Sequence, residues 1–454
     1  MQLEHPSCLS RLPSYGSLLR SNEVTSQSPE IEPPRYSTQP TLNEETVAYT
    51  PRHSESRGPD SSFIKQWSQA TLILKHQEED QRLPTYGRNS IIEGELGLKN
   101  PDRVTSVSIK LFGQMASTAV DSECLSFGLC SNQKIVWKRE DGDSQIQRCP
   151  SILPISLRFP SSYAWGGKEY RMPPSFEATF LGVPALIVRV QYTLYVTITR
   201  TRSWKPSWIA SKTYVTLVNY RPRTRPARPI VMLETVVSSI KPHPEEWTQI
   251  ITKMDVRSEF ANAKSIECHI FIPSVQTFAI NDSVPFHIQL IGTLTSLREL
   301  LPPTSPQLLL PGEQRIQRRA SVDHRKTPSI RVFIERQVVV EANNRRKFKS
   351  FTVGQGDMWP VPPLPSAITQ GSSRNDENPD TEYSVDWQGK LKCWDEVRAG
   401  GFAVSHLCVK DFLHLSLTPP NPRSSFLAPL QLSHPIRFVT DPWIDNAVAH
   451  PSDR

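Results

Sequence analysis

The sequence contains a short motif with the residue types of a peptide ligand, Pro33-Pro34-Arg35-Tyr36. Two consecutive prolines preset a polyproline II conformation, which fits the aromatic groove of a WW domain at little entropic cost, while the tyrosine fills a second pocket. The motif therefore predicts WW-domain binding through Pro33, Pro34 and Tyr36. The alternative is a chance occurrence in a proline-rich segment. Leu12-Pro13-Ser14-Tyr15 and Leu83-Pro84-Thr85-Tyr86 are weaker L-P-x-Y relatives, and we expect Tyr86 to pack at the start of a strand.

A second motif, Arg318-Arg319-Ala320-Ser321-Val322, has the residue types that basophilic protein kinases recognise. Arg318 and Arg319 would pair with acidic residues of the kinase, and Val322 would fill an apolar pocket. A phosphate adds about −1.5 to −2 charge at neutral pH, which the surrounding arginines would pair. The motif predicts a phosphorylation site at Ser321, and the alternative is a solvated basic loop.

Basic residues gather in two further segments. They are Arg221, Arg223, Arg225 and Arg228 in the stretch RPRTRPARP, and Arg345, Arg346, Lys347 and Lys349. Because Lys+Arg number 52 against 45 Asp+Glu, one interpretation is an anion-binding surface that contacts acidic lipid headgroups. The other is a stiff connector whose arginines pair with nearby carboxylates or carbonyls, and the alternating prolines favour it. No aromatic platform or recognition helix accompanies the charge, so we do not expect a nucleic-acid partner.

Motifs of the common enzyme classes are absent. The sequence has no H-E-x-x-H, G-x-S-x-G or G-x-G-x-x-G, and Gly166-Gly167-Lys168 fails as a phosphate-binding loop because Ser162 and Glu169 stand at two required positions. Its seven cysteines contain no C-x-x-C pair. We therefore expect no catalytic residues, no metal and no cofactor. Gly354-Gln355-Gly356 is interpreted as a turn after a strand at 348–353.

The elements that position these motifs are strands. With 41 Pro, 19 Gly and 37% hydrophobic residues, the chain cannot be one uniformly packed globule, and residues 1–62 have the composition of a disordered tail. From Phe63 on, apolar residues recur at every second position, as in Val190, Tyr192, Leu194, Val196 and Ile198. This period predicts half-buried strands. Further examples begin at Val107, Leu153, Val284 and Leu413, and a weak helical pattern spans Ser296 to Leu301.

We predict an all-β chain of two sandwiches divided by the proline-rich connector. The first domain is expected at 63–222 and the second at 223–443, with long mobile loops at about 302–329 and 366–381 and a short tail at 444–454. The chain has no apolar run long enough to span a membrane, and its second residue is Gln2 where myristoylation needs glycine. A cytoplasmic protein is the expectation.

The order of these segments resembles the arrestin fold, in particular the fungal arrestin-like proteins of the α-arrestin family of trafficking adaptors. The segments that carry the resemblance are IIEGELGL (91–98), VTSVSIKLFGQ (104–114), LPISLRFP (153–160), MPPSFEATF (172–180), VQYTLYVTITR (190–200), CHIFIP (268–273), DSVPFHIQLIG (282–292), GGFAVSHLCVKDFLHLSLTPP (400–420) and HPIRFVTDPW (434–443). Two features depart from the family pattern: Tyr86-Gly87-Arg88-Asn89 replaces the usual Pro-Gly, and a long basic loop follows Leu301.

The resemblance covers about residues 63 to 443 and implies two tandem immunoglobulin-like β-sandwiches without catalytic activity. It also implies an adaptor that recognises plasma-membrane transporters or receptors as cargo and recruits a WW-domain HECT-type ubiquitin ligase for ubiquitin-dependent endocytosis. Such an adaptor would be cytoplasmic and recruited to the plasma membrane or endosomes. An arrestin-fold signalling or sorting scaffold without a ubiquitin ligase is the alternative.

Overall fold

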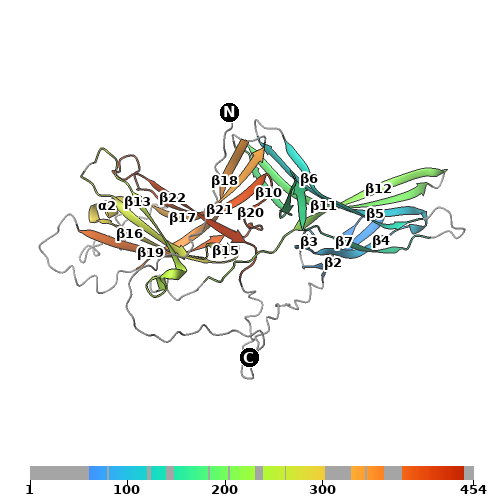
Figure 1. Ribbon diagram of the computed structural model, residues 1–454, viewed down its shortest axis with the longest axis horizontal. Helices are drawn as coiled ribbons and strands as arrows, with labels where there is room; N and C mark the ends of the chain where they lie inside the picture. Colours follow the sequence, from blue (N-terminus) through green and yellow to red (C-terminus); the bar gives the residue numbers. More distant parts are fainter. Residues whose placement is uncertain are drawn as a thin grey trace, which may run out of the picture. The chain divides into compact units, whose positions relative to one another are not determined.

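The computed structural model describes residues 61–78, 81–119, 124–139, 148–182, 185–202, 205–230, 239–260, 262–301, 329–342, 345–361 and 381–443 (Figure 1), without the side chains of 202–209 and 342–345. The predicted tails lie outside these residues, as do nearly all positions of the two predicted loops. Strands dominate the described residues, and their apolar side chains pack between sheets. The prediction of an all-β fold built from β-sandwiches is confirmed.

Two sheets and a small hairpin form the first half. The first sheet has the order β1 (Ser61–Gln66), β2 (Ala70–Gln77), β4 (Ile91–Leu98) and β7 (Ile152–Arg158). The second has the order β3 (Thr85–Tyr86), β12 (Lys205–Tyr220), β11 (Leu186–Arg202), β5 (Val104–Ala119) and β6 (Leu125–Lys138), with β10 (Phe176–Phe180) also paired to β11. β8 (Ser162–Trp165) and β9 (Lys168–Arg171) form the hairpin.

The alternating pattern places one face of each sheet in a shared core. Tyr192, Leu194 and Val196 of β11 are 0% exposed, and so are Leu72 of β2 and Leu96 of β4 in the other sheet. All five belong to one hydrophobic cluster. Burying each such side chain stabilises the fold by about 1.5 to 3 kcal/mol, which explains why a period of two is sufficient to predict these strands.

Side chains close the two open sides of this first sandwich. On one side, Asn132 and Lys134 of β6 donate to the carbonyls of Arg158 and Ser156 on the outer edge of β7, each over 3.1 Å. On the other side, Trp67 stacks on Tyr214 of β12 with ring centroids 4.8 Å apart. Two backbone carbonyls at the edge of β7 are thereby satisfied without a further strand.

The second half is one curled sheet with its own core. Its order is β13 (Trp247–Met254), β14 (Ile266–Pro273), β16 (Val284–Thr293), β19 (Glu382–Cys393), β18 (Arg345–Val361), β17 (Ile330–Ala342), β21 (Leu407–Leu417), β22 (Leu430–Val439) and β15 (Thr277–Ala279), with β20 (Phe402–Ala403) paired to β21. The predicted strands that begin at Val284 and Leu413 are β16 and part of β21. Their inward residues Phe286, Ile288 and Leu415 are 0% exposed.

The interpretation of Gly354-Gln355-Gly356 as a turn is wrong, because these residues lie inside β18. There β18 changes neighbours: it pairs with β17 up to Gln355 and with β19 from Gly354 onward. A Cβ at Gly354 would lie 2.2 Å from the carbonyl oxygen of Lys392. The glycine therefore permits a close approach of two strands, a role that glycine can have within a strand.

The weak helical pattern corresponds to α2 (Leu294–Leu300). Thr293 caps its first turn, because the Thr293 hydroxyl accepts the Ser296 N–H over 3.3 Å. Leu297 and Leu300 are fully buried in the second core. The helix begins two residues before the predicted start, and its buried leucines fix it to the sheet.

The second half also buries an ion pair that its sequence does not reveal. Arg336 on β17 donates from Nε to Asp411 Oδ1 of β21 over 2.7 Å, and from Nη1 to the Ala399 carbonyl over 2.7 Å. The Arg336 and Asp411 side chains are 4% and 0% exposed. Because each charge lies against its counterpart, the pair avoids the penalty of an unpaired buried ion.

The two hydrophobic cores meet at an interface that we call the seam. Val338 and Val340 of β17 and Leu407 and Val409 of β21 belong to the first hydrophobic cluster, although their strands are part of the second sheet. In Figure 1, β18 and β20 accordingly lie beside β10. The predicted boundaries 63–222 and 223–443 stay predictions, and the first strand of the described residues begins at Ser61.

Candidate functional site

The connector from Arg221 to Ile230 is the part of the predicted binding surface that the structure describes best. It begins where β12 ends at Tyr220, whose ring stacks on Phe159 with centroids 4.3 Å apart. The Arg221 N–H donates to the Tyr86 carbonyl over 2.8 Å, which extends the parallel pairing of β3 with β12. The start of the connector is thus fixed to the first sandwich.

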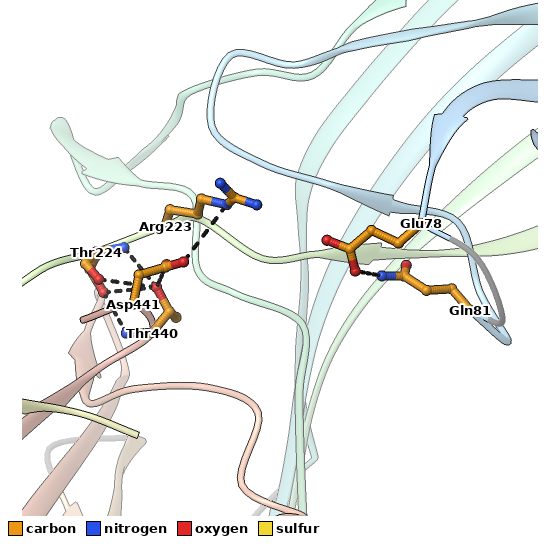
Figure 2. Close-up of polar contacts among 6 residues, drawn as sticks. All are labelled: Glu78, Gln81, Arg223, Thr224, Thr440 and Asp441. Carbon is orange, nitrogen blue, oxygen red and sulfur yellow. Dashed lines mark hydrogen bonds and ion pairs between the residues drawn. The ribbon is translucent and has the colours of Figure 1, made fainter. Parts of the chain in front are cut away.

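A pair of threonines holds the middle of the connector to the end of β22 (Figure 2). The Thr224 N–H donates to Thr440 Oγ1 over 2.8 Å, and the Thr440 N–H donates to Thr224 Oγ1 over 3.2 Å. The Asp441 N–H donates to the Thr224 carbonyl over 3.0 Å. We call Thr224, Thr440 and Asp441 the threonine clasp. Each neutral hydrogen bond contributes about 0.5 to 1.5 kcal/mol, so the clasp is a local fastening of moderate strength.

The arginines of the connector are directed to separate partners. Arg223 Nε lies 3.9 Å from Asp441 Oδ1, and Figure 2 shows its guanidinium turned away from the two threonines. Arg228 donates from Nη2 to Ser274 Oγ over 2.6 Å, and its Nη1 lies 4.0 Å from Glu246 Oε2.

Arg225 is exposed and has an interaction partner, and Arg221 is half-buried. This geometry favours the structural interpretation of the basic connector over a dedicated anion site, because Arg223 and Arg228 already have acidic or hydroxyl neighbours. Exposed ion pairs of this kind each contribute about 0 to 1 kcal/mol. The anion-binding role of Arg221, Arg223, Arg225 and Arg228 stays a prediction.

Figure 2 also shows the segment between β2 and β3. Gln81 Nε2 donates to a carboxylate oxygen of Glu78 (Figure 2). Gln77, which is 3% exposed, accepts the Thr85 N–H on its side-chain oxygen over 2.7 Å. These contacts hold β3 in place and therefore support the strand to which Arg221 is bonded.

Aromatic contacts form a second connection between the two halves, at the seam. Phe176 meets Phe402 with centroids 5.5 Å apart, and Phe180 meets Phe351 at 5.4 Å. His406 packs against both Phe127 and Trp165. In addition, Tyr163 and Ser405 share a hydrogen bond of 2.9 Å between their hydroxyl oxygens. The halves are joined by this seam as well as by the connector.

The tail and loop motifs lie outside the described residues. This holds for Pro33, Pro34, Tyr36 and Tyr15, and for Arg318, Arg319 and Ser321. The weaker relative Tyr86 is described, and this residue is 5% exposed in β3. Burial raises the pKa of the Tyr86 hydroxyl well above its ordinary value. Tyr86 is therefore packed in the first core and is not presented to a partner.

The second basic group lies at the start of β18. Arg346 forms an exposed ion pair with Glu341 across the β17–β18 hairpin, with Arg346 Nη2 3.7 Å from Glu341 Oε2. Lys347 also has a partner. Between them and Lys349, Phe348 is 61% exposed. At this strand end Arg346 and Phe348 are exposed, while Lys347 and Lys349 are half-buried.

The described residues contain no cluster of three or more His, Cys, Asp or Glu side chains that could hold a metal ion. Burial raises the pKa of Cys130 to about 11 and that of Cys268 to about 12. Both thiols are therefore protonated at neutral pH and are weak nucleophiles. No helix among the described residues is both long and apolar enough to cross a bilayer.

Sequence reasoning missed the clasp and the seam. Thr224 stands between two Arg-Pro units, and Thr440 stands in the final TDPW segment, so only a link between two remote stretches would have revealed the contact. No family model matches this chain, and a search of curated proteins finds no significant similarity.

Proposed function

We propose that this chain is a non-catalytic adaptor that recognises membrane cargo proteins and recruits a WW-domain ubiquitin ligase of the HECT type to them. The observation that supports the proposal is the pair of β-sandwich cores, joined by a fastened connector and a packed seam. In the sequence, Pro33-Pro34-Arg35-Tyr36 precedes these cores. An arrestin-like identity is part of the proposal.

The mechanism is proximity. The motif ends 25 positions before β1 begins at Ser61, so a ligase bound at Tyr36 is tethered to any cargo that the sandwiches hold. A tether of this length gives an effective concentration on the order of millimolar. A weak contact between the motif and a WW domain is then sufficient for ubiquitin transfer to a bound cargo protein.

A pull-down of the full chain with isolated WW domains of HECT-type ligases tests ligase recruitment. We expect the Pro34→Ala, Tyr36→Ala variant to bind at least about tenfold more weakly, a loss of about 1.4 kcal/mol, because it removes the preset conformation and the second anchor. The matched control is the Pro13→Ala, Tyr15→Ala variant, which alters the weaker relative in the same segment. Equal binding by the wild type and the Pro34→Ala, Tyr36→Ala variant would contradict recruitment through this motif.

A second experiment separates the adaptor from a scaffold without a ligase. Cells that express the chain without residues 1–60 are compared with cells that express the full chain, and ubiquitylation of a co-purifying membrane protein is measured. The adaptor predicts that cargo still co-purifies while its ubiquitylation falls. Ubiquitylation that persists at the full level would favour the scaffold.

A further inference from the structure

One end of the first sandwich carries a group of basic side chains. At this end β4, β6 and β11 finish, β7 and β12 begin, and the short helix η1 (Pro101–Arg103) leads into β5. We call the six basic residues there the basic end: Lys99, Arg103, Lys138, Arg139, Arg148 and Arg200. Because β12 runs from this end to Tyr220, where the connector leaves, the basic end lies at the opposite end of the sandwich from the connector.

Two half-buried arginines form the centre of the basic end, and backbone carbonyls hold both of them. Arg139 donates from Nη2 to the carbonyls of Asp102 and Val104 over 3.0 and 3.1 Å. Arg200 donates from Nη2 to the Lys99 carbonyl over 2.9 Å. These bonds fix the two guanidinium groups without neutralising their charges.

Both guanidinium groups also have donors that are not used. The Nε atoms of Arg139 and Arg200 are buried and have no hydrogen-bond partner. Burial raises the pKa of the Cys149 thiol to about 11, and the nearby positive charges of Arg139 and Arg200 oppose that rise. The two groups thus lie close to the same thiol, and an anion bound at this end would be attracted by both.

Carboxylates do not pair with these charges in the part of the chain that the structure describes. The other four residues of the basic end are exposed, and none of the six forms an ion pair with a described carboxylate. Asp102 is the one described acidic residue within three positions of any of them. The sequence adds Glu140, Asp141 and Asp143 outside the described residues. Six basic residues against four acidic ones still leave an excess of positive charge.

The kind of charge and its distribution indicate phosphate groups on a surface. A guanidinium group matches phosphate because it presents parallel donors to two oxygens. Lys99 and Arg148 flank β4 and β7 of one sheet, whereas Lys138 and Arg200 belong to β6 and β11 of the other. Since stacked sheets lie about 10 Å apart, the charges cover the end of the sandwich. Such an array fits several phosphates side by side, as acidic lipids present them.

We propose that the basic end binds the phosphate groups of acidic lipids and places this end of the first sandwich on a membrane surface. Each basic residue near an acidic membrane strengthens binding about fivefold, and salt weakens the attraction by screening. The proposal goes beyond the adaptor function and does not depend on it, because lipid binding requires neither a cargo protein nor a ligase.

Cosedimentation of the full chain with vesicles tests the proposal. The wild type should bind vesicles of about one-quarter phosphatidylserine in phosphatidylcholine, and it should bind phosphatidylcholine alone at least about tenfold more weakly. Binding should decrease as the ionic strength rises. The Lys99→Gln, Arg103→Gln variant removes two exposed side-chain charges, so its dissociation constant for the acidic vesicles should be about 25-fold higher. Equal binding of the wild type to both kinds of vesicle would overturn the proposal.

The matched control is the Lys390→Gln, Lys392→Gln variant, which removes two exposed charges from β19. It should bind the acidic vesicles like the wild type. Equal weakening by the two double variants would indicate attraction by net charge alone and would overturn the basic end as the site. Asp102→Asn should strengthen binding about fivefold, because it removes a carboxylate from this end. Circular dichroism of the variants confirms folding.

Free phosphates are a second source of the same chemistry. Calorimetric titration with inositol hexakisphosphate measures binding of a soluble polyphosphate. A chain that binds this compound and does not bind the acidic vesicles would overturn the membrane proposal, and so would a chain that binds neither. The Pro34→Ala, Tyr36→Ala variant should bind the acidic vesicles like the wild type, so a failure of ligase recruitment is distinguished from a failure of lipid binding.

Discussion

At the scale of single residues, burial of His434 of β22 makes the stability of the fold depend on pH. Its Nε2 is buried and has no hydrogen-bond partner in the structure. Burial lowers the pKa of His434. The folded state therefore holds the proton less tightly than the unfolded chain, in which a histidine pKa is near 6.5. Stability from the neutral imidazole is fully present above that value and decreases as the pH falls through it toward the folded pKa.

We predict that His434→Gln reduces the loss of stability on acidification. Urea unfolding at about pH 7.5 and at about pH 5.5, on either side of the ordinary histidine pKa, measures this effect. The difference between the two unfolding free energies should be smaller for His434→Gln than for the wild type. The exposed His243 provides the control, because His243→Gln should keep the wild-type difference. Equal differences for all three proteins would show that His434 does not contribute to the pH dependence.

At the scale of elements, β18 depends on a residue without a side chain. Gly354→Ala would place a methyl group 2.2 Å from the Lys392 carbonyl oxygen and 2.6 Å from Ile334 Cδ1. Backbone on the Lys392 side cannot move without disturbing the pairing of β18 with β19. We predict a loss of about 1 to 3 kcal/mol in unfolding free energy, the range for overpacked sites.

Denaturant unfolding measures this loss, with Gly182→Ala as the control. A Cβ at Gly182 meets nothing within 4 Å, so that variant should unfold within about 0.5 kcal/mol of the wild type. If Gly354→Ala were as stable as Gly182→Ala, the two strands would have room to separate, and the proposed close approach would not constrain β18.

Strands were the part of this chain that its sequence revealed best. A period of two in β11 or β16 results from burial of one face, and that cause is local. Contacts between remote segments leave no such pattern. Arg336 and Asp411 meet across β17 and β21 although each alone reads as a surface residue, and Gly354 reads as a turn until its neighbour Lys392 is known.

The candidate site shows the same limit. The arginines and prolines at 221–229 predicted an extended connector whose arginines pair with carboxylates or carbonyls. In the structure, Asp441 lies near Arg223 and Glu246 lies near Arg228. The hydrogen bonds of Thr224 could not be predicted, because their partner Thr440 lies 216 positions away. Local composition thus indicated the kind of segment, while the fold alone decides where it is fastened.

At the scale of the whole molecule, two connections join the halves, and they differ in kind. The seam buries apolar side chains such as Val338 and Leu407 in the first core, and burial of such side chains is favourable over the whole interface. The threonine clasp consists of a few polar bonds in a half-buried segment. Loss of the clasp should therefore open the connector locally while the seam keeps the halves together.

Trypsin can detect local opening of the connector, because only one bond of this segment is open to cleavage. It does not cleave when proline follows the arginine, so Arg221, Arg225 and Arg228 are protected by Pro222, Pro226 and Pro229. Within 221–229 only the bond between Arg223 and Thr224 is open to the protease, and Thr224 is the residue that the clasp holds.

We predict that Thr440→Val accelerates cleavage at this bond about tenfold. Valine lacks the hydroxyl that accepts the Thr224 N–H and donates to the Thr224 carbonyl over 3.2 Å, and the loss of these two hydrogen bonds weakens the closed state by roughly 1 to 2 kcal/mol. Mass spectrometry of the fragments over time measures the rate, and cleavage should vanish in an Arg223→Gln background. Thr440→Ser keeps the hydroxyl and should cleave like the wild type, whereas equal rates for Thr440→Val and Thr440→Ser would mean that the seam, and not the clasp, holds the connector closed.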